Sequence, residues 1–186
     1  MCAMKNSDKP MLQAEVGGRG RVDTCEGLQR PGYMVHDFSL PTISGNRIRI
    51  SDYRGRASLV LFFLGNSSKD NGFLKELAGR KNELTEQEAI VIAIAPHMPG
   101  IELQKMAAKF VLVLVDEDTK IHRQFGAVDQ QGQPASVIYI TDKFGEVVSV
   151  HSELNHKQLP NISEIVKTLE FISHQCPECE PSEWPR

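Results

Sequence analysis

The sequence predicts a three-layer α/β/α fold built on a central mixed sheet. Three continuous apolar runs, at residues 59–64, 90–95 and 111–115, have the composition of strands that are covered on both faces. Residues with helical spacing follow each run, and this alternation is typical of parallel neighbouring strands. Two further apolar runs, 137–140 and 147–150, flank a turn segment with Asp and Gly, which predicts an antiparallel hairpin and therefore a mixed sheet.

Local patterns predict the other elements, taken in chain order. Residues 47–51 alternate charged and apolar side chains and predict a half-exposed strand before the first buried one. Three helices should follow the buried strands, and their apolar positions are Phe73, Leu74, Leu77 and Leu84, then Ile101, Leu103, Met106, Ala107 and Phe110, then Ile121 and Phe125. Pro99 is placed for an early turn of the second helix, and Gly126 can end the third.

A last helix is expected before the C-terminal tail. Asn161 and Glu164 have the spacing of a capping box at its start. Its apolar face consists of Ile162, Ile165, Val166, Leu169 and Ile172. A helix of about 15 residues would run roughly 22 Å along the sheet, so its end should lie far from the end of the first buried strand.

A chain of 186 residues is long enough for one domain with a substantial core. We expect an N-terminal extension over residues 1–30, one domain over 31–174 and a C-terminal tail over 175–186. The formal net charge of −3 gives no reason to expect nucleic acid or an acidic membrane as a partner. No apolar run approaches the roughly 20 residues that span a bilayer, and residues 1–9 lack the apolar segment of a secretory signal, so we expect a cytoplasmic protein.

Several short motifs occur in a fixed order. They are Asp37-Phe38-Ser39-Leu40-Pro41 with Gly45, Ile50-Ser51-Asp52-Tyr53-Arg54-Gly55, Leu59-Val60-Leu61-Phe62-Phe63, and Pro134 followed by Val137-Ile138-Tyr139-Ile140 and Gly145. Together they resemble the alkyl hydroperoxide reductase and thiol-specific antioxidant family, the peroxiredoxin-like redoxins, over about residues 31–174. The resemblance implies a thioredoxin-like fold, an antioxidant oxidoreductase activity on peroxide or disulfide, and a thiol partner as reductant.

The cysteine on which that family depends is missing from its usual place. In peroxiredoxins it opens the helix after the Phe-Phe strand, where the helix N-terminus and a nearby Arg favour its thiolate. Here an ungapped alignment places Gly72 at the cysteine, whereas alignment to a thioredoxin Cys-x-x-Cys places Ser67 and Asp70 near the two cysteines. A Ser hydroxyl is almost never ionised near neutral pH, so it cannot replace a thiolate toward peroxide.

We expect this degenerate site to persist as a concave surface, because helix starts offer free N–H groups to anions and carbonyls. Its residues would be Ser67, Ser68, Lys69, Asp70 and Gly72, with Pro134 opposite. Pro134 stands about where the family has its Arg. It also has the place of the cis-proline of thioredoxin-like pockets, and the sequence leaves its isomer open.

Cys176-Pro177-Glu178-Cys179 concentrates the remaining chemistry, while Cys2 and Cys25 lie in the N-terminal extension. Three interpretations stay open. The pair can be a redox centre, since a second thiol resolves a disulfide and tends to lower the pKa of the first. It can be half of a zinc site, completed by His174, Cys25, His156 or a second subunit. Otherwise it is a structural tail whose thiols do nothing. As a redox or metal site it would be a separate centre held by the tail, with Trp184 packed as an anchor.

Two functions are therefore predicted as alternatives. The first is a thiol-dependent redoxin-family oxidoreductase that acts without a cofactor through Cys176 and Cys179. The second is a non-catalytic thioredoxin-fold module that binds a protein, a small ligand or zinc. Because the last helix runs away from the degenerate site, the cysteine pair should emerge far from Ser67 and Gly72 of its own chain, and only the partner subunit of a homodimer could bring it there.

We expect no metal site from the histidines and no carboxylate dyad from the acidic run. No pair among the six histidines has the i, i+4 spacing of a helical metal site, so each is expected to lie on the surface or to be partly buried. Asp116, Glu117 and Asp118 are expected to place negative charge at a helix N-terminus rather than to form a carboxylate dyad.

Overall fold

A computed structural model describes residues 28–65, 68–107, 110–154 and 158–174. All four cysteines, Ser67, His156 and Trp184 lie outside these residues. The predicted division at residues 30 and 174 also falls at the edges of the described part, and it stays a prediction.

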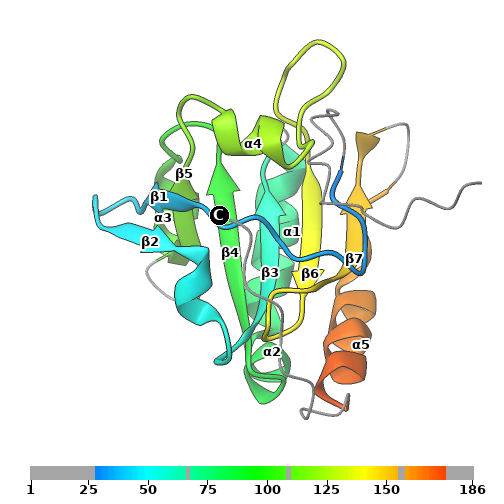
Figure 1. The fold of residues 1–186 in the computed structure, drawn as a ribbon. Helices are drawn as coiled ribbons and strands as arrows, with labels where there is room; N and C mark the ends of the chain where they lie inside the picture. Colours follow the sequence, from blue (N-terminus) through cyan, green and yellow to red (C-terminus); the bar gives the residue numbers. More distant parts are fainter. Residues whose placement is uncertain (1–27, 66–67, 108–109, 155–157, 175–186) are drawn as a thin grey trace, which may run out of the picture.

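The centre of the fold is a five-stranded mixed sheet with the strand order β5-β4-β3-β6-β7 (Figure 1). Its strands are β3 (Ser58–Phe63), β4 (Ala89–Ala95), β5 (Leu112–Val115), β6 (Val137–Thr141) and β7 (Val147–Ser152). β4 pairs in parallel with both β3 and β5, whereas β6 pairs antiparallel with both β3 and β7. The predicted α/β fold with a mixed central sheet and a closing hairpin is therefore confirmed.

The segment before β3 differs from the prediction. β1 (Ser39–Pro41) and β2 (Arg47–Arg49) form a separate antiparallel pair, and β1 was not predicted because three residues ending in Pro give no periodicity. The strand expected over residues 47–51 stops at Arg49. Ile50–Tyr53 forms a 3-10 helix, η1, whose start is held by Asp37, because that carboxylate accepts hydrogen bonds from the Ser51 backbone N–H and hydroxyl.

The helices are α1 (Ser68–Gly79), α2 (Lys81–Glu86), α3 (Ile101–Ala107), α4 (Lys120–Gln124) and α5 (Ile162–Ser173). The single helix predicted around Phe73 to Leu84 is in fact α1 and α2, which are separated at Arg80 directly after Gly79, a poor helix former. Pro99 precedes α3 instead of lying in its first turn. The capping box of α5 is confirmed, since the side chains of Asn161 and Glu164 each accept from the other's backbone N–H.

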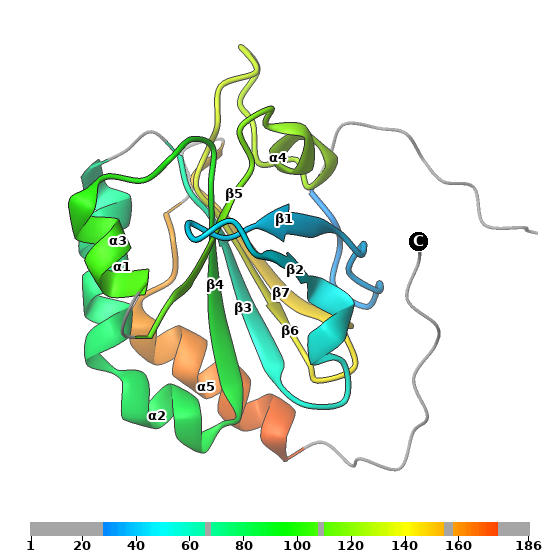
Figure 2. The same ribbon diagram turned by 90° about the vertical axis from the view of Figure 1, so that its left-hand side faces the viewer.

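Two apolar clusters hold the layers together. Figure 2 shows α1, α2, α3 and α5 on one face of the sheet, and β1, β2 and α4 on the other. β3 serves both faces because alternate side chains of a strand point in opposite directions. Val60 and Phe62 belong to the cluster under the larger helices, and Leu61 and Phe63 to the cluster under β1 and α4.

The two ends of the sheet differ in the helices that begin or finish there. The parallel strands β3, β4 and β5 all finish at one end, at Phe63, Ala95 and Val115. α1 begins at this end and α4 lies there (Figures 1 and 2). We call this end the α1 pole. The helix α5 finishes at the opposite end (Figures 1 and 2), as predicted. Within the described residues, no helix is long and apolar enough to cross a membrane.

Candidate functional site

A buried carboxylate stands at the start of α1. Asp70 lies in the first helical turn and is only 2% exposed. The hydroxyl of Ser136, which is also buried, donates a hydrogen bond of 2.8 Å to its Oδ1 atom. Negative charge is favourable at a helix N-terminus, because the first N–H groups of the helix point toward it. The first turn of α1, two residues before the aligned position Gly72, therefore holds a carboxylate that is already bonded within the chain.

Ser136 reaches Asp70 because the end of β3 passes very close to it. A Cβ atom added to Gly65 would lie 2.9 Å from Ser136 Oγ and 3.1 Å from its backbone nitrogen. Any larger residue at this position would push the two segments apart. Gly65 was not singled out by sequence reasoning, and no local pattern marks a close approach to a residue 71 positions away.

The structure distributes the predicted site residues differently from the sequence interpretation. Ser68 is the first residue of α1. Of the next two residues, Lys69 is exposed and Asp70 is buried, so these neighbours face different surroundings. Gly72 is exposed, and a Cβ added there would meet nothing within 4 Å. The expected concave surface along these residues stays a prediction, because Asp70 and Ser136 occupy part of that space with their own contact.

Pro134 lies in the segment that leads into β6. It is half-buried and forms an isolated bridge with Val128. No cis peptide bond occurs among the described residues, so the isomer that the sequence left open is trans. The likeness to a thioredoxin cis-proline therefore does not extend to the geometry of this residue.

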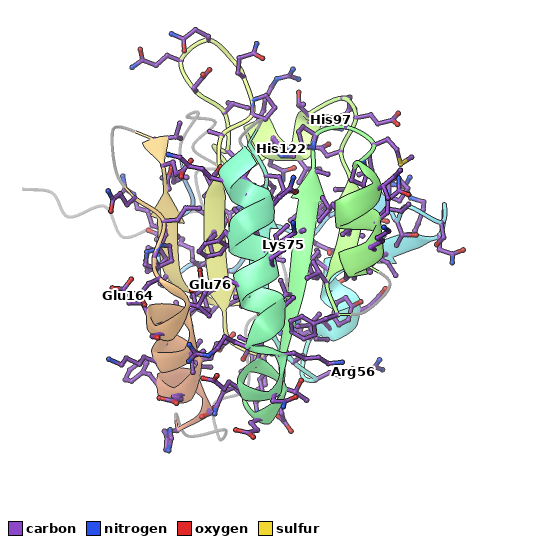
Figure 3. All side chains as sticks on the ribbon, turned by 180° about the vertical axis from the view of Figure 1, so that it is seen from behind. Arg56, Lys75, Glu76, His97, His122 and Glu164 are labelled. Carbon is purple, nitrogen blue, oxygen red and sulfur yellow. The ribbon has the colours of Figure 1, made fainter. Side chains whose placement is uncertain are left out.

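A second buried carboxylate lies at the same pole, where β5 ends. Asp116 and His122 are 1% and 0% exposed, and 2.6 Å separates Asp116 Oδ2 from His122 Nδ1. The same carboxylate accepts the backbone N–H groups of His122, at 2.8 Å, and Ile121, at 3.3 Å. Figure 3 places His122 at the end of the molecule where α1 begins.

This pair corrects one prediction and sharpens another. His122 is fully buried rather than on the surface or partly buried; Ile121 and Phe125 share its buried face, and their spacing around His122 was the available signal. Asp116 does serve a helix N-terminus, as predicted for the acidic run. Asp118 shares this role, since its carboxylate accepts the Lys120 N–H, whereas Thr119, the residue before α4, has a positive φ of 53° and makes no side-chain cap.

The surroundings of Asp116 determine its ionisation. Burial alone would raise the pKa of this carboxyl, but the hydrogen bonds from the imidazole of His122 and from the two backbone N–H groups outweigh burial and leave the pKa below its usual value. The carboxylate is therefore ionised at neutral pH, and Nδ1 of His122 carries the proton of the shared hydrogen bond. His122 Nε2 is buried without a hydrogen-bond partner among the described residues, and the ring packs edge-on with Phe63 at 5.3 Å.

No described group of residues is suited to hold a metal ion. Among residues 28–65, 68–107, 110–154 and 158–174, no three His, Cys, Asp or Glu side chains come together for this purpose. His174, one of the predicted zinc ligands, is exposed just after α5, with Nδ1 2.6 Å from the carbonyl oxygen of Glu170. The other predicted zinc ligands lie outside the described residues.

The fold is that of a peroxiredoxin-like redoxin, and the segment 64–75 around the start of α1 contains no cysteine. Residues 31–150 match the AhpC/TSA family, and the chain belongs to that family. No curated protein matches it by sequence.

Solved peroxiredoxin structures share the fold. Peroxidoxin BcpB from Mycobacterium tuberculosis is 24% identical with a TM-score of 0.62, and the match covers 76% of this chain and 97% of that one. AhpC from Enterococcus faecalis is 19% identical with a TM-score of 0.63, covering 81% and 98%. The reduced 2-Cys peroxiredoxin of Plasmodium vivax is 12% identical with a TM-score of 0.64, covering 77% and 82%. At these identities the likeness concerns the fold.

The close approach at Gly65 gives a prediction with a built-in control. Gly65→Ala places a methyl group against Ser136, so we expect it to lower the free energy of unfolding by about 1–3 kcal/mol. Gly72→Ala meets no neighbour and improves helix propensity, so we expect it to raise that free energy by up to about 1 kcal/mol. Urea unfolding of both variants checks this, and equal effects of the two substitutions would show that the contact with Ser136 is unimportant.

The lowered pKa of Asp116 predicts how stability depends on pH. Its ionised form contributes stability at any pH above the usual carboxyl range, and this contribution is lost as the pH falls through the lowered native pKa. We expect Asp116→Asn to lower the free energy of unfolding by about 3 kcal/mol at neutral pH. The gap between the wild type and this variant should close below about pH 4. Denaturant titrations over this pH range measure the gap, and a gap that stays constant in acid contradicts the assignment.

Proposed function

We propose that this chain is a thiol–disulfide oxidoreductase of the AhpC/TSA family whose redox centre is the Cys176–Cys179 pair. One observation carries the proposal: no cysteine occurs between residues 26 and 175, and the first turn of α1 holds the buried Asp70–Ser136 contact. A carboxylate and a hydroxyl cannot form a disulfide. If the chain performs the thiol chemistry of its family, it does so with cysteines outside the described domain.

The proposed reaction is ordinary thiol–disulfide exchange. One thiolate of the pair attacks a sulfur of the substrate disulfide, and the first substrate thiol leaves as the mixed disulfide forms. The second cysteine of the pair then attacks that mixed disulfide and releases the second substrate thiol. The substrate gains two electrons, and the protein is left with a Cys176–Cys179 disulfide, which a partner dithiol reduces again. A reducing compartment such as the cytoplasm suits this cycle.

The position of α5 supports a centre that works apart from the α1 pole. The helix finishes at the opposite end of the sheet, and the tail with Cys176 follows directly. A disulfide substrate would therefore meet the tail without entering the degenerate site of the same chain.

The alternative is a non-catalytic binding module with a structural or zinc-binding tail. The buried contact between Asp70 and Ser136 favours it, because these polar groups at the start of α1 are engaged in packing within the chain. Under this proposal a zinc ion would take Cys176 and Cys179 as thiolates, with two further ligands from this chain or from a second copy.

Cysteine variants separate the two functions. We expect Cys176→Ser and Cys179→Ser each to lower the rate of disulfide reduction at least about 100-fold, since each thiol has its own step in the exchange. Cys25→Ser is the matched control and should keep the wild-type rate. Purified protein is assayed with a small aromatic disulfide and a dithiol reductant, and its zinc content is measured in parallel.

Each result of this assay decides between the proposals. Bound zinc that is lost in Cys176→Ser, together with no disulfide reduction in the wild type, would establish the binding module. Disulfide reduction, or rapid peroxide consumption, that survives the combined change of Cys176 and Cys179 to Ser would refute the proposed redox centre.

We propose in addition that the chain forms a homodimer through its α1 pole. Met98 and Ile101, which lie just before and at the start of α3, are 52% and 69% exposed although both are large apolar residues. Changing both to Lys should convert a dimer into a monomer in light scattering coupled to size-exclusion chromatography. A wild-type chain that is monomeric at about 100 μM would contradict this proposal.

A further inference from the structure

The two buried carboxylates of the α1 pole are joined by a short series of hydrogen bonds. The backbone N–H of Ala127 donates to the carbonyl of His122 at 2.8 Å, and the N–H of Ala135 donates to the carbonyl of Ala127 at 3.0 Å. Ser136 follows directly, and its hydroxyl donates to Asp70. A continuous path therefore runs from α4 to the first turn of α1.

The middle of this path is a compact turn that can transmit a displacement. Val128 and Pro134 form a bridge across it. The carboxylate of Asp129 accepts the backbone N–H groups of Gln131 and Gln133, at 2.8 and 2.9 Å. Because these bonds lie within the segment 127–135, the segment should move as one unit. Its position therefore depends on its contacts with α4 at one end and on Ser136 at the other.

One of those attachments is α4, and Asp116 and His122 fix α4. This helix has five residues and no side-chain cap from Thr119. Its Lys120 N–H donates to Asp118, and the carboxylate of Asp116 accepts the next two N–H groups, those of Ile121 and His122. The imidazole of His122 adds a third bond to the same carboxylate and packs on Phe63, the last residue of β3. The carbonyl that receives Ala127 belongs to His122 itself.

We propose that Asp116 and His122 are a positioning pair for the start of α1. They hold α4 and, through the segment 127–135, place Ser136 so that its hydroxyl meets Asp70. The proposal goes beyond the proposed function, because it concerns the α1 pole and holds whether or not Cys176 and Cys179 are redox-active. It also means that a partner that shifts α4 changes the first turn of α1.

Two substitutions of His122 separate positioning from packing. His122→Phe keeps an aromatic ring but removes the N–H that donates to Asp116, whereas His122→Asn keeps an N–H donor near the Nδ1 position on a smaller side chain. Native-state hydrogen exchange is followed at the amides of residues 72–74 in α1. We expect about fivefold to tenfold faster exchange in His122→Phe, the factor that loss of one hydrogen bond gives, and near wild-type exchange in His122→Asn.

A control for global stability is needed, because any core substitution accelerates exchange. Leu169→Ala removes a buried side chain from α5 without touching the path from His122 to Asp70. Compared at equal global stability, this variant should leave the exchange of residues 72–74 in α1 close to that of the wild type. If it accelerates them as much as His122→Phe does, or if His122→Asn behaves like His122→Phe, the proposal is overturned.

Ser136→Ala tests the far end of the path and keeps the proposal falsifiable if His122→Phe does not fold. It removes only the hydroxyl that reaches Asp70. We expect it to reproduce the acceleration at residues 72–74 and to leave the amides of Ile121 and His122 protected. Unchanged exchange at residues 72–74 in this variant would show that the contact does not position α1.

Discussion

The start of α1 is a place where the fold favours a buried acidic group, because the first N–H groups of a helix point toward it, and the identity of that group decides the chemistry of the α1 pole. In the peroxiredoxins that this chain resembles, a cysteine thiolate is the charged group. In this chain the acidic group of the first turn is Asp70, two residues before Gly72, and the Ser136 hydroxyl donates to it. A thiolate in that position is a nucleophile, whereas a carboxylate with a hydroxyl bound to it is a structural contact. The same helix geometry therefore serves stability in one case and reactivity in the other.

The two carboxylates of this pole hold different parts of the chain. Asp116 gathers donors from α4, all within six residues of itself in the sequence, and so builds a local turn. Asp70 receives its donor from Ser136, which lies 66 positions away, and so ties the first turn of α1 to the entry of β6. Both are buried, so removal of the Ser136 hydroxyl or of the His122 imidazole would leave a buried carboxylate with fewer hydrogen bonds, which is why such contacts tolerate little change.

Much of the fold could be predicted from the sequence because its core strands are continuous apolar runs. The apolar runs that became β3, β4 and β5 are buried almost throughout, and the turn at Asp142 to Gly145 gave the hairpin. The failures were local. β1 is too short for periodicity, Gly79 divides one apolar pattern into α1 and α2, and η1 is set by Asp37 from 14 positions away. The site was harder, since Gly65, Asp70 and Ser136 become neighbours only through the pairing of β3 with β6. His122 was read as an isolated histidine because its partner, six residues earlier, follows no helical spacing.

We propose that the tail cysteines, and not residues at the start of α1, carry the redox chemistry of this chain. The most direct measurement is to trap the exchange intermediate with full-length single-cysteine variants of the tail. Either Cys176→Ser or Cys179→Ser is mixed with a disulfide substrate and digested, and the substrate-bearing peptide is identified by mass spectrometry. The account predicts that one of the two variants accumulates a mixed disulfide on its remaining tail cysteine, while wild-type protein shows a Cys176–Cys179 disulfide. Adducts confined to Cys2 or Cys25, or no adduct at all while substrate is being reduced, would contradict it.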